Sequence, residues 1–338
     1  MNTSSMGFSP IGQAAIERRA MAPVFIVGNM RSGTTVLHKT LLQAIDAAVD
    51  IDPSDLESRP FWMKHGIQCG TILTGTFCAA ASADTVSEET KARIRSVFNK
   101  ASARGSRVIT KNVHFCNKIP LLHELFPDAL YIHILRQDLS VVASMKKAFT
   151  NFSEGKTLWG TSCIHYWPDE PRPCWNVLSR QQLPQRRVVK EKLRRLVTHR
   201  SLILTPAFAD WTAFRKEHPD PTRYFPGGGF QRLEESWVKS NHNILLDVKD
   251  LGLAPRYLAI NYHSMVEKPK NVFRAVADFL GVKYKSGSTF ENLTAGRQDK
   301  WQHQLTAAEI EICKTQRENF SLEGSILAEK LPGPVFAA

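Results

Sequence analysis

Long apolar runs are missing from this sequence. No segment approaches the roughly 18 consecutive apolar residues of a membrane-spanning helix, and Met1 to Met21 contain no continuous apolar core of the kind found in signal peptides. The sequence also contains no internal repeat and no low-complexity tract. These absences predict a soluble, cytoplasmic protein in which residues 1–21 form a polar leader.

Cysteine pairs are missing as well. The six cysteines are scattered, without a C-x-x-C pair and without the ligand spacing of a metal site. This pattern is expected of reduced thiols in a cytosolic compartment. The sequence therefore predicts neither structural zinc nor a catalytic metal.

Acidic residues are too few to balance the basic ones. Lys and Arg number 44 against 32 Asp and Glu, which gives a formal net charge of +12 and a pI near 9.5. Such a charge suits nucleic acid, an anionic membrane surface or a polyanionic small ligand, and composition does not distinguish among them. With 338 residues and 43% hydrophobic content, the chain can form one large domain or two small ones.

Short apolar runs alternate with segments of helical periodicity. The expected strands are 23–28, 107–111, 129–135 and 256–262, and the expected helices are 34–48, 119–126, 140–147 and 271–280. Alternating strands and helices favour a parallel sheet, because each crossover needs a helix and both faces must be covered. The sequence therefore predicts an α/β fold, with a P-loop-like parallel β-sheet flanked by helices on both faces.

The middle of the chain interrupts this alternation. Residues 149–232 contain clustered prolines, four tryptophans and a glycine triplet. We interpret this stretch as an inserted, mostly helical cap that forms the acceptor region. The expected organisation is a single domain at 22–330 that includes this insert, followed by a tail at 331–338.

A glycine-containing loop, G-N-M-R-S-G-T-T at residues 28–35, joins the first strand to the first helix. Free N–H groups and the positive dipole end at a helix N-terminus favour a phosphate. The Gly28-x4-Gly33 spacing matches the start of a Walker A loop, but Thr34 occupies the lysine position, so the usual clamp on β and γ phosphates is absent. Arg31 could instead reach a shorter 5′ anion. The alternative is an ordinary glycine turn with a surface arginine.

The segment N-M-R-S-G-T-T at 29–35 resembles the 5′-phosphosulfate loop, P-R-S-G-T-T, of the PAPS-dependent sulfotransferase superfamily, and in particular its bacterial type. In that family, an arginine at a strand end and a serine eight residues later hold the donor's 3′-phosphate. Arg136 and Ser144 have this spacing, and helical geometry lets both face one anion. Taken alone, Arg136 would be an ordinary strand-end charge and Ser144 a surface residue.

The resemblance extends over residues 22–148 and 233–314 and leaves the middle unmatched. Further similar segments are K-N-V-H at 111–114, L-F-P-D-A at 125–129, N-Y-H-S-M-V-E-K-P at 261–269 and G-R-Q-D-K-W at 296–301. Asn261 and His263 replace the family's usual arginine and glutamate, so we interpret that segment as scaffold. Arg297 is expected to close over the 3′-phosphate.

What the resemblance implies is a sulfotransferase that takes a sulfuryl group from 3′-phosphoadenosine 5′-phosphosulfate (PAPS) and releases adenosine 3′,5′-bisphosphate (PAP), without a metal. The donor-binding residues that it implies are Arg31, Ser32, Gly33, Thr34, Thr35, Arg136, Ser144 and Arg297. The acceptor is expected to be the hydroxyl or amine of a small molecule or carbohydrate.

Sulfuryl transfer requires in-line attack and neutralisation of charge on the bridging oxygen. The resemblance places Arg31 and Lys111 to stabilise the sulfonate and the leaving phosphate, although Lys111 could also be a solvated strand-end lysine.

A general base is also required, and two residues are candidates. Several branches of the family place a glutamate just before an aromatic pair, and Glu57, ahead of Phe61 and Trp62, resembles that arrangement. Glu57 could equally be a surface or helix-cap carboxylate. His114 is the second candidate, because imidazole titrates near neutral pH and the cytosolic branch uses a histidine soon after the lysine.

Two other functions are open. A P-loop small-molecule kinase would share the loop and the fold, but it requires a lysine in the loop and an acidic pair for the metal. A basic nucleic-acid-binding protein would explain the net charge but not two separate anion sites, so no nucleic-acid partner is expected. The basic run at 186–197 is expected to be the solvated face of a docked helix, or else a contact with an acidic acceptor such as a sulfated glycan.

Overall fold

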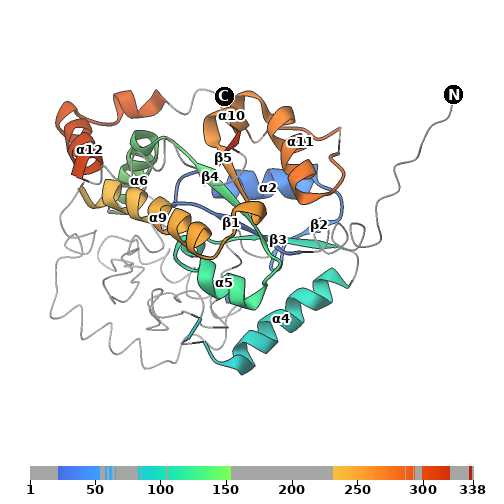
Figure 1. Ribbon diagram of the computed structural model, residues 1–338. Coiled ribbons are helices and arrows are strands. Elements are labelled where there is room, and N and C mark those ends of the chain that lie inside the picture. Colours follow the sequence, from blue (N-terminus) through green and yellow to red (C-terminus); the bar gives the residue numbers. More distant parts are fainter. Residues whose placement is uncertain are drawn as a thin grey trace, which may run out of the picture.

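The structure is a computed structural model that describes part of the chain (Figure 1). The described residues are 22–53, 58, 61–62, 65, 83–84, 86–103, 106–153, 231–285, 287–291, 293, 299–319 and 335–336. Three predicted features lie outside them: Glu57, Arg297 and residues 154–230 of the insert, which include the basic run.

In the described part of the chain, six parallel strands form one sheet in the order β2-β3-β1-β4-β5-β6. The strands are β1 (Val24–Val27), β2 (Ala48–Val49), β3 (Arg107–Lys111), β4 (Leu130–Leu135), β5 (Tyr257–Asn261) and β6 (Val335–Phe336). Strand β1 lies between β3 and β4, with Val24 opposite both Ile109 and Leu130. The loops that follow β1, β3 and β4 therefore emerge side by side at the carboxyl edge of the sheet. The predicted α/β fold with a parallel sheet is confirmed.

Alternating side chains divide the core into two layers, because successive residues of a strand point to opposite faces. In β4, Leu130, Ile132 and Ile134 join one cluster of buried residues, whereas Tyr131 joins the other. The first face is covered by α2 (Thr34–Ala44), α10 (Tyr262–Glu267) and α11 (Pro269–Leu280). The second is covered by α4 (Glu88–Ser102), α5 (Ile119–Leu125), α6 (Asp138–Ser153) and α9 (Gln231–Asp250), with α12 (Ala307–Asn319) against α9 (Figure 1). Short 3₁₀ helices are η1 (Val113–Asn117), η3 (Ala254–Arg256) and η4 (Asp299–His303).

Several elements begin or end at other residues than the sequence predicted, and two segments differ in kind. The helix expected at 34–48 stops at Ala44, because Ile45 adopts an extended conformation and forms a bridge with Tyr284. Ala48 and Val49 then enter the sheet beside β3. In the segment expected to be a tail, Val335–Phe336 pairs with β5 as an edge strand.

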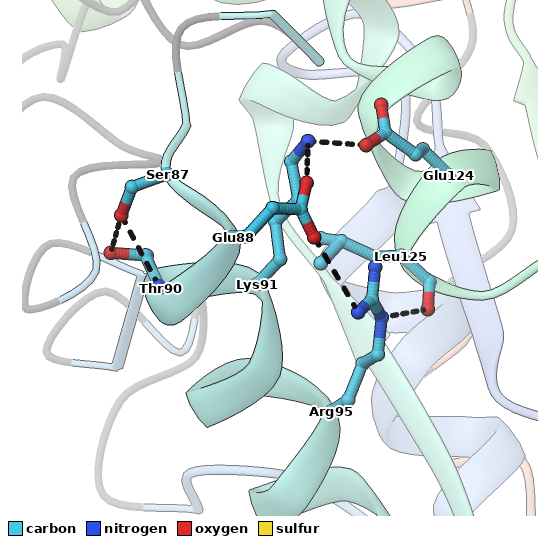
Figure 2. Close-up of polar contacts among 7 residues, drawn as sticks. All are labelled: Ser87, Glu88, Thr90, Lys91, Arg95, Glu124 and Leu125. Carbon is cyan, nitrogen blue, oxygen red and sulfur yellow. Dashed lines mark hydrogen bonds and ion pairs between the residues drawn. The ribbon is translucent and has the colours of Figure 1, made fainter.

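Polar contacts fasten α4 to α5 on the second face (Figure 2). Lys91, whose side chain is almost completely buried, bridges Glu88 of its own helix and Glu124 of α5. Arg95 donates from Nε to the carbonyl oxygen of Leu125 at 3.2 Å (Figure 2). Since α5 lies between β3 and β4 in the chain, these contacts hold the outer layer beside the strands that carry the predicted site.

Membrane-spanning helices and metal-binding clusters are both absent from the described residues. None of the described helices is both long and apolar enough to cross a membrane. No group of His, Cys, Asp and Glu side chains within the same residues could hold a metal ion. Cys116 and Cys313 are buried free thiols.

Candidate active site

The loop between β1 and α2 has a backbone that only certain residues tolerate. Gly28 has φ 148° and Gly33 has φ 102°, values that side chains rarely permit. A Cβ at Gly33 would also lie 2.5 Å from Cδ2 of Tyr262. Arg31 adopts φ 67° although it is not glycine, which is a conformation often found at functional loops. The close approach of Tyr262 explains why residue 33 has to be glycine.

The start of α2 fits an anionic ligand. Its N-cap, Gly33, provides no side chain to cap the helix, so the N–H groups of the first turn have no side-chain cap. The hydroxyl of Ser32 is buried and has no hydrogen-bond partner among the described residues. A buried hydroxyl without a partner is costly. The loop therefore combines a buried hydroxyl donor with a positive helix end, and its role in binding the 5′ anion stays a prediction.

Lys111, the last residue of β3, lies against this loop. It is completely buried, and its Nζ donates to Oγ1 of Thr35 at 2.7 Å. The alternative of a solvated strand-end lysine is therefore wrong. A buried ammonium needs hydrogen bonds and is stabilised by a nearby negative charge. Lys111 contacts the loop that is predicted to bind the 5′ group of a nucleotide, and that group would supply the negative charge.

The second predicted site is directly connected to the first. Arg136, which follows β4, donates from Nη1 to the carbonyl oxygen of Arg31 at 3.1 Å. In the opposite direction, Arg31 donates from Nε to Oγ of Ser144 at 3.0 Å. Partial desolvation lowers the pKa of Arg31, which stays charged at neutral pH. The sequence predicted that Arg136 and Ser144 face one anion; the structure links each of them to Arg31 of the loop, a contact that the sequence did not indicate.

An aromatic ring lies between the two sites. The guanidinium carbon of Arg136 is 4.5 Å from the ring centroid of Tyr262, a cation–π distance. The same ring packs against Gly33. We interpreted residues 261–269 as scaffold, and Asn261 indeed caps α10 by accepting from the backbone N–H of His263 at 2.8 Å. Tyr262 nevertheless contacts both anion-binding segments, which the sequence pattern did not indicate.

Of the two candidate bases, His114 is among the described residues and Glu57 is not. The residue that follows Glu57, Ser58, is buried and lies 3.2 Å from Oγ1 of Thr110. Thr110 immediately precedes Lys111 in β3. His114 lies in η1 and is buried, and its backbone N–H donates to Oδ1 of Asn112 at 2.9 Å.

Buried acids border the second site. Burial raises the pKa of Glu234 to about 9, and the charge of Asp138 acts in the same direction. Glu234 is therefore protonated at neutral pH, whereas Nε of Arg317 lies 3.0 Å from Oδ2 of Asp138. Asp138, the partner of Arg317, follows Arg136 by two residues in the chain.

Three residues of α9 contact the site and were missed by the sequence analysis. Nδ2 of Asn29 donates to the carbonyl oxygen of Ser236 at 2.9 Å and to Oγ of Ser240 at 3.1 Å. Nε1 of Trp237 donates to the carbonyl oxygen of Arg136 at 3.1 Å. The only signal in the sequence is S-W-x-x-S at residues 236–240, in which polar groups recur one helical turn apart.

The fold and the two predicted anion sites indicate a class: a parallel α/β protein suited to a ligand with two anionic groups at the carboxyl edge of its sheet. A profile of the sulfotransferase family matches residues 23–199, more than half of the chain. The chain therefore belongs to the sulfotransferase family and is an enzyme of that kind. The family implies PAPS as the sulfuryl donor.

Solved structures with similarity to this chain are also sulfotransferases. The sulfotransferase domain from the curacin biosynthetic pathway is 15% identical, with a TM-score of 0.47 over 89% of this chain and 98% of its own. A Mycobacterium avium sulfotransferase is 12% identical, with a TM-score of 0.45 over 98% and 89%. A mouse sulfotransferase complexed with PAP is 14% identical, with a TM-score of 0.37 over 97% and 98%. A search of curated protein sequences found no match.

Proposed function

We propose that this enzyme transfers the sulfuryl group of PAPS to a hydroxyl or amine of a small-molecule or carbohydrate acceptor by in-line displacement. The observation that carries the proposal is the contact between the two anion sites, in which Arg136 donates to the loop and Arg31 donates to Ser144. PAPS has two anionic groups on one ribose, so a site for it needs two anion-binding segments that lie next to each other.

The described residues suit the two ends of this donor. The loop N–H groups and the hydroxyl of Ser32 would bind the 5′ group, together with the start of α2 at Gly33, Thr34 and Thr35. Arg136 and Ser144 would hold the 3′-phosphate. Ser144 accepts from Arg31, which leaves its own O–H to donate to a phosphate oxygen. The closing role of Arg297 stays a prediction.

Charge stabilisation falls to Arg31 and Lys111. Lys111 carries three donors, one of which reaches Thr35 at the start of α2. In a site shielded from water, such donors stabilise charge on the sulfonate and on the leaving phosphate more than they would in water. This mechanism requires no metal, so activity should persist in the presence of EDTA. Loss of activity that magnesium restores would favour a kinase-like mechanism instead.

The acceptor must lose a proton as it attacks, and we assign this proton to Glu57, with His114 as the alternative. The assignment is supported by the neighbouring residue, since Ser58 contacts Thr110 next to Lys111. A carboxylate there would need to be within hydrogen-bond reach of the acceptor. Residues 154–230, including the basic run, would then complete the acceptor region of an enzyme that we expect in the cytoplasm.

Two measurements test the proposal. Isothermal titration calorimetry should show binding of PAP and weak competition by ATP, because the loop lacks the lysine that clamps β and γ phosphates. Equal affinity for ATP and PAP would contradict the donor assignment. Mass spectrometry of an acceptor panel incubated with enzyme and PAPS should then reveal a product heavier by one sulfuryl group, and an acidic glycan in the panel tests the basic run.

A further inference from the structure

Helix α9 contacts both anion-binding segments from one side. Residues 236 and 240 are one helical turn apart, and so are residues 237 and 241, so these four residues share a face of α9. Their partners are Asn29 in the loop and Arg136 at the end of β4, together with His133 in β4. In Figure 1, α9 lies beside α6, the helix that carries Ser144.

The contact with the loop is buried. Asn29 follows Gly28 and is completely buried, and its amide donates to a backbone carbonyl and to the hydroxyl of Ser240. An amide in such a place holds its segment firmly, because breaking the contact would leave buried polar atoms unpaired. The entry to the 5′ loop is therefore fixed relative to α9.

The contact with the strand end involves the residue that binds the 3′ anion. Trp237 donates to the backbone carbonyl of Arg136, while the guanidinium of Arg136 lies over Tyr262. One residue therefore has its backbone fixed by α9 and its side chain fixed by α10. An arginine side chain has several rotatable bonds, so it loses less conformational entropy on binding an anion when its backbone and its guanidinium group are already held in place.

Helix α9 itself is firmly attached to the sheet. Ile244 and Val248 are completely buried, and Asn241 accepts from Nε2 of His133 at 2.8 Å. Burial lowers the pKa of His133 to about 4, so this ring is neutral at pH 7 and the contact does not depend on its charge. The helix can therefore serve as a rigid reference for the two segments that it touches.

We propose that α9 sets the separation of the two anion sites, with Trp237 positioning the 3′ site and Asn29 positioning the 5′ site. This inference rests on the proposed function, because it concerns recognition of a donor with two anionic groups. A change at Trp237 should weaken only the 3′ interaction, and a change at Asn29 only the 5′ interaction. A merely structural role of α9 would affect both interactions equally.

Three nucleotides separate the two interactions in calorimetry on the full chain: PAP, adenosine 3′-monophosphate and adenosine 5′-monophosphate. Trp237→Phe keeps a ring and removes the N–H donor. It should weaken PAP and the 3′-monophosphate about threefold to tenfold, the range for one lost neutral hydrogen bond, and leave the 5′-monophosphate within about twofold. Asn29→Ala should show the reverse pattern. Leu246→Ala, an exposed position of the same helix, is the control and should change none of the three affinities.

One further variant completes the test. If Asn29→Ala does not fold, Ser240→Ala removes one of the acceptors on the helix side and should give the same selective loss in a smaller amount. Equal losses for both monophosphates, or no loss, would overturn the inference. A wild-type protein that binds PAP no better than either monophosphate would contradict the proposed function as well, so the two failures are distinguishable.

Discussion

The two predicted anion sites differ in composition: one is formed mainly by backbone and the other by side chains. The 5′ site is largely backbone, held by Gly28, Gly33 and the positive φ of Arg31, and its side chains at Asn29 and Ser32 are buried. The 3′ site consists of two partly exposed side chains, one arginine and one serine, on a strand end and a helix. A backbone site tolerates little change, because one altered residue disturbs every donor of the loop. A side-chain site loses one interaction at a time.

The largest effect should come from a residue that belongs to neither site. Glu57→Gln keeps size and hydrogen-bonding reach but removes basicity, so kcat should fall about 10²–10⁴-fold. PAP affinity should stay nearly unchanged, because both anion sites remain intact. Steady-state kinetics with an identified acceptor and calorimetry with PAP measure the two quantities.

The histidine variant decides between the two candidate bases. His114→Ala should have the smaller effect on kcat. Near-normal turnover of Glu57→Gln combined with an inactive His114→Ala would move the base to His114.

Gly33→Ala should damage the backbone site as a whole. The new Cβ would approach the ring of Tyr262 while φ is 102°, and strain and overpacking together should lower the free energy of unfolding by about 2–5 kcal/mol. Denaturant unfolding measures this loss, and PAP binding should be lost even where the variant is folded.

A matched glycine variant separates the effect of the steric clash with Tyr262 from the effect of backbone strain. Gly281 has φ 68° and would place its Cβ in open space, so Gly281→Ala should cost about 1–2 kcal/mol from the backbone alone. Equal losses for the two variants would show that the contact with Tyr262 does not matter.

Arg136→Ala should damage mainly the side-chain site, because in the loop it removes only the hydrogen bond to the carbonyl oxygen of Arg31. PAP affinity should fall by about 1.5–3 kcal/mol, the scale of a charge-assisted hydrogen bond, with little change for adenosine 5′-monophosphate. Calorimetry on both ligands gives the comparison. If the affinities for PAP and for adenosine 5′-monophosphate fell equally, the 3′ site would not be separable from the loop, and the contrast between a backbone site and a side-chain site would fail.

A pH-dependent effect of about 1 kcal/mol per pH unit should come from the acids near the predicted 3′ site. The folded protein keeps a proton on Glu234 up to a pKa of about 9, whereas an unfolded glutamate releases it near its ordinary pKa of about 4.3. The free energy of unfolding should therefore fall as pH rises through this window. Glu234→Gln does not titrate, so its stability relative to the wild type should rise by roughly 1 kcal/mol per pH unit between pH 6 and 8. Parallel stability profiles would contradict the assignment.

The sequence predicted the four inner strands of the described sheet, β3, β1, β4 and β5, because each depends on local signals, and the two predicted anion sites rest on local signals as well. Buried apolar runs indicate β1, β3 and β4 directly, and the spacing of Arg136 and Ser144 lies within one strand–helix unit. The burial of Lys111 was not predictable, since a lysine at a strand end can face solvent or protein. The positive φ of Arg31 was not predictable either, because no glycine marks it.

The contacts of α9 were beyond sequence reasoning for a different reason. Asn29 and Ser236 are 207 positions apart, and their meeting depends on where α9 crosses the sheet. Serine and tryptophan at 236–240 have the spacing of any polar helix face. Only the packing of Ile244 and Val248 into the core turns this face toward the loop.

The close approaches of the two loop glycines have a consequence for the order of folding. Gly28 lies against the carbonyl oxygen of Ile134, and Gly33 lies against Tyr262. The loop is made early during synthesis, but its neighbours leave the ribosome only after more than a hundred and more than two hundred further residues, respectively. Because domains fold as their chains emerge, the nascent loop waits for β4 and then for α10. Nucleotide binding by a stalled nascent chain would therefore appear only once Tyr262 has emerged.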